Sequence, residues 1–238
     1  MAIHKRPDFI HHQQRNVKER MREFVFGMED GMVSTFGSIT GIALATRDPF
    51  TILLAGFVII SVESISMAVG SYLSNKSANA IDARMMDEER LEIDEYPDEE
   101  KKELVDMYIR DGWSRTLAKN MAEEASKNKK LFLQEMAYRE LEVLPNKKHN
   151  PVQNGVIMGV SYIIGGLIPL VPYLFVHTIR GIVISAGVTA VGLFCLGVFV
   201  SHYSKRSPLR SGGEMLLLAG IAATVGYIVG QVIDRLIV

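Results

Sequence analysis

Residues 85–103 read MMDEERLEIDEYPDEEKKE, a stretch dense in carboxylates that follows a long apolar run. It contains two pairs of glutamates with members three residues apart, and on a helix this spacing puts both carboxylates on one face. Like charges so placed repel each other unless a cation lies among them, and carboxylate oxygens are suitable ligands for one. The stretch therefore predicts a cation site formed by the two pairs that flank Pro97: Glu89, Glu92, Glu100 and Glu103.

A second stretch, MAYRE at residues 136–140, can add ligands from a later helix. Met136 would supply a thioether sulfur and Glu140 another carboxylate. Together the two stretches predict a small bundle of helices around a carboxylate-rich cation site, placed between segments that look membrane-spanning.

Composition separates the chain into two kinds of segment. Apolar, glycine-rich segments follow the charged start and fill the last third, whereas residues 75–150 are charged throughout. The formal net charge of −1 argues against a general nucleic-acid binder. The single cysteine, Cys195, excludes an internal disulfide and any cysteine-based metal cluster.

Five apolar segments are long enough to cross a bilayer as helices. We therefore expect an all-α integral membrane protein with five transmembrane helices and a cytoplasmic helical insert between the second and third. The expected domains are a basic amphipathic lead-in (1–23), the first two spans (24–74), the metal-binding insert (75–150) and three further spans (151–238).

Polar side chains inside the first two predicted spans are candidates for a translocation path. Asp30 lies in the first span, where an acid is costly unless it faces protein or water; the alternative is a place at headgroup level. Glu63 and Met67 are one turn apart on the same face of the second span. A hard carboxylate beside a soft thioether suits a borderline ion such as Fe²⁺ better than Mg²⁺ or Ca²⁺.

The second span is predicted to extend beyond the membrane. No glycine or proline interrupts residues 71–96, so one long helix should continue to the break before Pro97. Capping and stop signals then predict three shorter helices in the insert. These cover residues 98–111, 114–126 (with Ser114 as its N-cap) and 129–144.

Positive charges predict the orientation. With an odd number of spans, the N-terminus, the insert and the loop with Lys205, Arg206 and Arg210 lie on one side, and the other side carries fewer Lys and Arg. The positive-inside rule makes that side cytoplasmic. The start of the chain is too polar for a cleavable signal, so we expect a plasma membrane in a prokaryote and a vacuolar membrane in a eukaryote.

Three motifs in the apolar segments carry a resemblance to a known family: GMEDGMVST at 27–35, ISMAVGSYL at 65–73 and GGLIPLVPY at 165–173. With these motifs, and with two spans, an acidic insert and three spans in that order, the chain resembles the vacuolar iron transporter family from about Phe24 onward. The resemblance implies a homodimeric secondary transporter, not an enzyme, with a ferritin-like insert and no prosthetic group. Such a protein exports Fe²⁺ and Mn²⁺ from the cytoplasm in exchange for protons.

The resemblance also assigns roles to individual residues. Asp30 and Met67 match residues of the family's translocation path. The insert's metal-binding residues match at Glu89, Glu92, Glu100, Glu103, Met136 and Glu140.

Two departures from the family pattern are present. Ala137 stands where relatives often have a second methionine. Ile59 stands where relatives usually have the acid of the second span, and Glu63 replaces a small residue. Because these two positions share a helix face, the acid is interpreted as having moved by one turn.

Two other functions fit parts of the sequence. A membrane-anchored ferritin-like di-iron oxidase or iron-storage protein would need only the insert, but such bundles normally carry Glu-x-x-His pairs. The helical part of the insert contains no histidine, since His149 follows Pro145. A metal sensor or scaffold would leave Asp30 and Glu63 unexplained, so transport is favoured.

Overall fold

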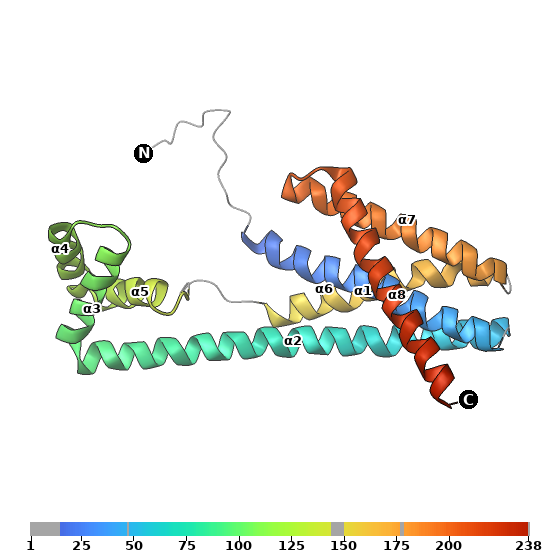
Figure 1. The fold of residues 1–238 in the computed structure, drawn as a ribbon. Helices are drawn as coiled ribbons and strands as arrows, with labels where there is room; N and C mark the ends of the chain where they lie inside the picture. Colours follow the sequence, from blue (N-terminus) through green and yellow to red (C-terminus); the bar gives the residue numbers. More distant parts are fainter. Residues whose placement is uncertain (1–14, 47, 144–149, 177–178, 238) are drawn as a thin grey trace, which may run out of the picture. The chain divides into compact units, whose positions relative to one another are not determined.

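The computed structural model describes residues 15–46, 48–143, 150–176 and 179–237, which form helices joined by short connections and contain no strand. The predicted all-α class is therefore confirmed for these residues (Figure 1). In chain order the helices are α1 (Arg15–Thr46), α2 (Pro49–Glu95), α3 (Pro97–Arg110), α4 (Arg115–Ser126), α5 (Lys129–Arg139), α6 (Pro151–Leu170), the 3-10 helix η1 (Val171–Leu174), α7 (Ile179–Ser204) and α8 (Pro208–Ile237).

Three helical segments among the described residues are long and apolar enough to cross a membrane. They are Pro49–Glu95, which is α2, Pro151–Leu174, which joins α6 to η1, and Arg180–Ser204 in α7. The membrane character of the chain rests on these segments, and the additional spans expected in α1 and α8 stay predictions.

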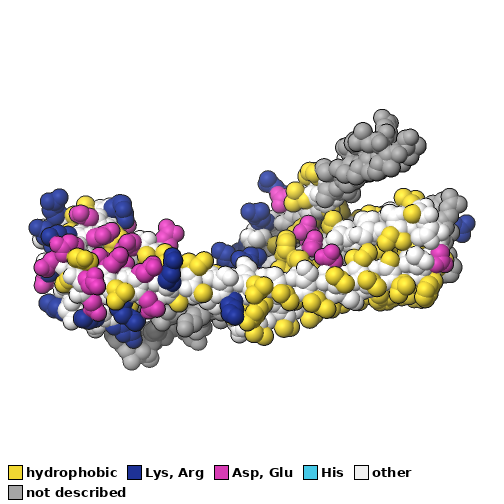
Figure 2. Space-filling model, turned by 90° about the horizontal axis from the view of Figure 1, so that it is seen from below, with side chains coloured by type: hydrophobic (Ala, Val, Ile, Leu, Met, Phe, Trp, Pro, Cys, Tyr) yellow, Lys and Arg dark blue, Asp and Glu magenta, His cyan; other side chains and the backbone are white. Residues whose placement is uncertain are grey.

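The chain divides into two compact units. The first, which we call the apolar unit, contains the described residues of 1–72 and 152–238; the second, the insert unit, contains those of 73–151. Helix α2 contributes its first part to the apolar unit and its last part to the insert unit. Figure 2 shows hydrophobic side chains over much of the visible face of the apolar unit, and acidic and basic side chains crowded on the insert unit.

Close backbone contacts hold the apolar unit together. A Cβ on Gly31 of α1 would lie 2.4 Å from the Tyr162 carbonyl oxygen of α6, and one on Gly165 would lie 2.3 Å from the Met28 carbonyl oxygen. Glycine at these positions therefore lets α1 and α6 approach more closely than any other residue would allow.

This crossing gives a direct test of the fold. We expect Gly165→Ala to destabilise the protein by roughly 1–3 kcal/mol, because the added methyl group must displace the backbone of α1. Gly187→Ala is the matched control, since a Cβ there would have nothing within 4 Å. Thermal unfolding of both variants in detergent measures the difference, and equal midpoints would contradict the close crossing.

The insert unit follows the predicted local signals with one exception. Pro97 starts α3, and the Ser114 hydroxyl caps α4 by accepting a hydrogen bond from the Leu117 N–H. Helix α5, predicted to reach residue 144, ends at Arg139. The chain turns at Glu142, whose φ of 53° is incompatible with a continuing helix.

Apolar side chains from all the helices of the insert unit form its core. Leu104, Met107 and Tyr108 point inward from α3, as predicted. They pack with Ile93 of α2 and with small and large residues of α4 and α5: Ala118, Ala122, Ala125, Phe132 and Met136. Figure 1 shows α3, α4 and α5 gathered at the end of α2, around this common core.

Candidate metal centre

Three carboxylates from different helices meet in the insert unit. Glu89 comes from α2, Glu100 from the first turn of α3, and Glu140 caps the end of α5. One ligand oxygen from each lies within 4.8 Å of the others. The turn at Pro97 brings Glu100 back toward Glu89, and the early end of α5 leaves Glu140 at the same place. We call this group the carboxylate cluster.

Burial makes the cluster unusual for acidic side chains. Glu89 is 1 % exposed and Glu100 is 8 % exposed, whereas Glu140 is exposed. Glu89 Oε1 and Glu100 Oε2 are buried and have no hydrogen-bond partner among the described residues. A buried, unpartnered carboxylate oxygen is destabilising, and a bound cation would satisfy it.

The pKa values of the three carboxyl groups in the cluster are raised. Burial raises the pKa of Glu89 from its ordinary 4.5 to about 8, and repulsion by Glu140 and Glu100 adds to the effect. Burial likewise raises the pKa of Glu100 to about 7, with Glu103 as the strongest neighbouring charge. Although the Glu140 side chain is exposed, partial desolvation of its carboxyl group raises its pKa, and the charge of Glu103 adds to the effect. These carboxyl groups can therefore exchange a proton for a cation near neutral pH.

The raised pKa values predict how stability depends on pH. Between the ordinary pKa of 4.5 and about 8, the folded metal-free protein binds more protons at Glu89 than the unfolded chain does. Its free energy of unfolding should therefore fall as the pH rises through this window. Thermal unfolding in the presence of a chelator from pH 6 to 8.5 measures the slope. Glu89→Gln should flatten it, and a rising stability in the native protein would contradict the assignment.

The remaining predicted ligands of the insert surround the cluster. Glu92 and Glu103 are exposed, and their charges act on Glu100 and Glu140. Met136 lies one turn before Glu140 on α5 and is completely buried in the core. The structure thus brings three of the six predicted residues into one group, with two more glutamates near enough to add negative charge.

A network missed from the sequence fixes α5 in place. The Tyr108 hydroxyl donates to Glu135 Oε2 at 3.0 Å, and Arg139 Nε donates to the same oxygen at 3.3 Å. Arg139 also pairs with Asp111 and stacks over the Tyr108 ring, with 4.4 Å between Cζ and the ring centroid. The four-residue spacing of Glu135 and Arg139 was the available signal. Since Glu140 follows Arg139 directly, this network positions a carboxylate of the cluster.

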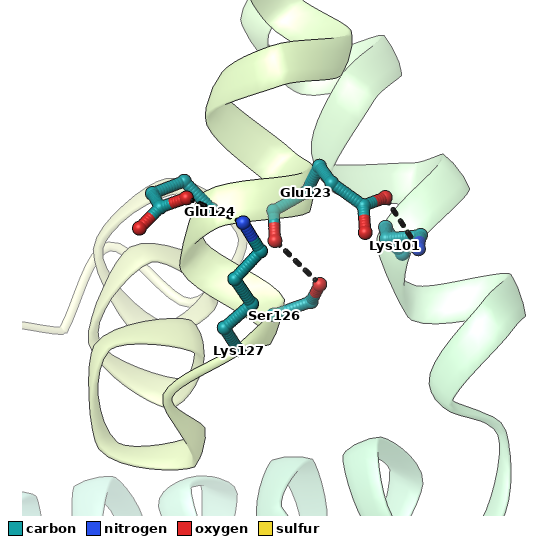
Figure 3. A network of polar contacts seen from close by, with 5 residues as sticks. All are labelled: Lys101, Glu123, Glu124, Ser126 and Lys127. Carbon is teal, nitrogen blue, oxygen red and sulfur yellow. Dashed lines mark hydrogen bonds and ion pairs between the residues drawn. The ribbon is translucent and has the colours of Figure 1, made fainter.

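Other charges of the insert unit belong to its surface. Lys101 of α3 pairs with Glu123 of α4 at 2.8 Å, and Lys127 pairs with Glu124 at 2.8 Å (Figure 3). The Ser126 hydroxyl donates to the Glu123 carbonyl oxygen in the same view. Exposed pairs of this kind contribute at most about 1 kcal/mol each, so these residues serve as controls for the cluster.

The apolar unit contains the second predicted group. Asp30 of α1 is half-buried, Glu63 of α2 is exposed, and the two carboxylates lie near enough to repel each other. Met67 is half-buried one turn further along α2. Ser34, one turn after Asp30, shares a hydrogen bond of 2.6 Å with the Tyr162 hydroxyl of α6.

One further acid of the apolar unit was missed from the sequence. Glu23 of α1 is 2 % exposed and accepts a hydrogen bond of 2.8 Å from the Ser71 hydroxyl of α2. Arg22 pairs with its other oxygen at 2.7 Å. Its burial could have been suspected, because Glu23 directly precedes the first apolar run.

The two groups define a class of protein: an all-helical chain with apolar helices and a carboxylate cluster suited to a divalent cation. Residues 21–231 match the family model of the VIT family. The chain therefore belongs to this family, and the resemblance to vacuolar iron transporters is confirmed.

Curated relatives agree over nearly the whole chain. Vacuolar iron transporter 1 of Arabidopsis thaliana is 27% identical over 228 residues, which cover 94% of this chain and 91% of the relative. Vacuolar iron transporter 1 of Oryza sativa subsp. japonica is 28% identical over 220 residues, covering 91% and 87%. The vacuolar iron transporter of Plasmodium falciparum is 27% identical over 237 residues, covering 94% and 86%.

Proposed function

We propose that this protein is a secondary transporter that moves Fe²⁺, and also Mn²⁺, out of the cytoplasm across a membrane in exchange for protons. The observation that carries the proposal is the half-buried acid Asp30 on α1 of the apolar unit, near enough to Glu63 of α2 for the two charges to act on each other. Membership of the VIT family and the names of the relatives support iron as the substrate. In a membrane-anchored oxidase, Asp30 and Glu63 would have no function.

The insert unit would gather the metal. Its carboxylate cluster offers Glu89, Glu100 and Glu140 at mutual distances that one divalent ion can bridge. Glu92 and Glu103 would add charge or further ligands, and Met136 a soft thioether that favours a transition metal. Ala137 in place of a second methionine would reduce that softness.

The apolar unit would carry the metal across. Asp30 and Glu63 would bind the ion as carboxylates and accept protons when it leaves, so the same groups couple the two flows. Met67 on the same face of α2 as Glu63 would tune selectivity. The half-buried state of Asp30 and the nearby charge of Glu63 favour this role over a place at headgroup level.

The proposed topology has five transmembrane helices, with the N-terminus and the insert unit in the cytoplasm. The membrane would be the plasma membrane of a prokaryote or the vacuolar membrane of a eukaryote. Support comes from the three apolar helical segments and from the positive-inside pattern.

We also propose that two copies form a homodimer through α1 and α2. Glu63 is exposed on α2 in the single chain, and an acid facing lipid costs roughly 2.5–3.5 kcal/mol. Gly37, Gly41 and Gly70 present open positions, since a Cβ on any of them would touch nothing within 4 Å. Such small-residue surfaces allow helices of a second copy to approach closely. A monomeric mass in mild detergent would contradict this arrangement.

The proposed function is tested by metal uptake into proteoliposomes. Purified protein is reconstituted, an acidic interior is imposed, and initial uptake rates are compared for Fe²⁺, Mn²⁺, Co²⁺ and Zn²⁺. We expect Fe²⁺ and Mn²⁺ to be moved fastest. Absence of divalent-metal flux under the proton gradient would remove the function proposed here.

A further inference from the structure

A pocket of about 360 Å³ lies in the apolar unit where α7 meets α8, and none of the acids described above lines it. Its volume is within the range of about 300–1,000 Å³ that is usual for small-ligand sites. The lining residues are Val198, Ser201, His202, Lys205, Arg206 and Pro208. We call it the α7–α8 pocket.

Close packing of α7 against α8 fixes the shape of the pocket. A Cβ on Gly197 would lie 2.5 Å from the Ser211 carbonyl oxygen, and one on Gly212 would lie 2.6 Å from the Phe194 ring. Lys205 ends α7 with a φ of 53°, the left-handed conformation that commonly terminates helices. The connection is therefore a tight turn held against both helices, with Lys205 and Arg206 at its centre.

The charges around the pocket favour an anion. Lys205, Arg206 and His202 line it, and no carboxylate does. Lys205 makes no ion pair with any residue that the structure describes. Arg206 is 3.9 Å from its nearest acid, Glu214, which also lies 3.5 Å from Arg210. The first turn of α8 begins at Pro208 and adds its partial positive charge to the same place.

The position of the pocket along the chain suggests where the anion comes from. It lies at the end of the apolar segment Arg180–Ser204, beside Tyr203, which is 52% exposed. Exposed tyrosines and the ends of apolar helices typically lie at the level of lipid headgroups. Basic pockets between helices on the cytoplasmic side are suited to anionic headgroups.

We propose that the α7–α8 pocket binds a phosphate group, supplied by the headgroup of an anionic lipid in the cytoplasmic leaflet. Arg206 and Lys205 would contact the phosphate oxygens, and His202 would donate a hydrogen bond. The proposal rests on the membrane topology given above, but it does not require metal transport. A test of lipid binding can therefore fail or succeed independently of a test of flux.

The experiment uses the purified full-length protein, delipidated in neutral detergent, with an equimolar mixture of phosphatidylglycerol and phosphatidylcholine. Native mass spectrometry counts the retained lipids. We expect selective retention of phosphatidylglycerol, and a loss of about fivefold in affinity for each cation removed, hence roughly 25-fold in the Lys205→Gln/Arg206→Gln variant. Arg210→Gln is the matched control because Arg210 is near the turn and does not line the pocket.

Inorganic phosphate distinguishes the two possible sources. If millimolar phosphate leaves phosphatidylglycerol bound, the lipid headgroup is the ligand. If phosphate displaces the lipid and binds the native protein, but not the double variant, in calorimetric titration, the free anion is the ligand. Equal retention of the two lipids, or unchanged phosphatidylglycerol retention in a double variant with native thermal unfolding, would overturn the proposal.

Discussion

Replacing Asp30 by asparagine is expected to reduce Fe²⁺ flux at least about a hundredfold, while metal binding by the insert unit stays close to native. Asparagine keeps the size of the side chain but removes the charge that binds the metal and accepts the proton. Changes to groups that merely support metal ligands already cost about 10–100-fold. Initial flux in vesicles and equilibrium metal binding are measured on the same preparations.

Asp48→Asn is the matched control for this substitution. Asp48 precedes α2 and accepts hydrogen bonds from the Thr51 N–H and hydroxyl, and asparagine caps helices as well as aspartate does. Fe²⁺ flux in Asp48→Asn should therefore equal that of the native protein. Native flux in Asp30→Asn would instead place Asp30 at the membrane surface and remove the proposed mechanism.

Two further variants test the other residues of the proposed translocation path. Glu63→Gln should reduce flux as severely as Asp30→Asn if Glu63 performs the task of the acid that relatives usually carry one turn earlier. Met67→Ala should have a smaller effect on flux and a larger one on the choice of metal, because a thioether adds selectivity more than charge compensation.

The second large effect is expected in the carboxylate cluster. Glu89→Gln should weaken metal binding by the insert unit by about a hundredfold and at the same time stabilise the metal-free protein at pH 8 and above. Metal affinity falls while stability rises because Glu89 is a buried carboxylate. Its negative charge binds the cation, but in the metal-free protein at high pH the same charge is destabilising. Glutamine keeps the shape without the charge and can donate to Glu140.

Glu123→Gln provides the comparison for this variant. Glu123 is an exposed partner of Lys101 outside the cluster, so its loss should change stability by at most about 1 kcal/mol and leave metal binding unchanged. Calorimetric titration with Mn²⁺ and thermal unfolding with a chelator give both quantities. Native metal stoichiometry and affinity in Glu89→Gln would return Glu89 to a structural role.

Sequence signals were sufficient where the structure depends on local chemistry. The uninterrupted run after Ser71 predicted the continuous α2, and Pro97 and Ser114 predicted the ends of neighbouring helices. The predicted end of α5 at residue 144 was wrong, because neither glycine nor proline marks the observed end at Arg139. That end coincides with the contact of Arg139 with Asp111 and with the left-handed Glu142, which no periodic pattern reveals.

The candidate site was predictable only in its composition. A three-residue spacing puts both members of a glutamate pair on one face, but it does not say which one is buried. In the structure Glu89 and Glu100 are buried, whereas Glu92 and Glu103 are exposed. The choice depends on how α3 and α5 fold back against α2, which is a tertiary property.

The most direct test of the central claim is whether a proton gradient alone concentrates Fe²⁺. Vesicles with an acidic interior and outward-facing insert units are given equal Fe²⁺ on both sides, and internal Fe²⁺ and internal pH are recorded together. We predict Fe²⁺ accumulation against its gradient with a matching rise of internal pH, and neither change in Asp30→Asn. Fe²⁺ that only equilibrates, or accumulation that persists in Asp30→Asn, would contradict the coupling of metal and protons at this carboxylate.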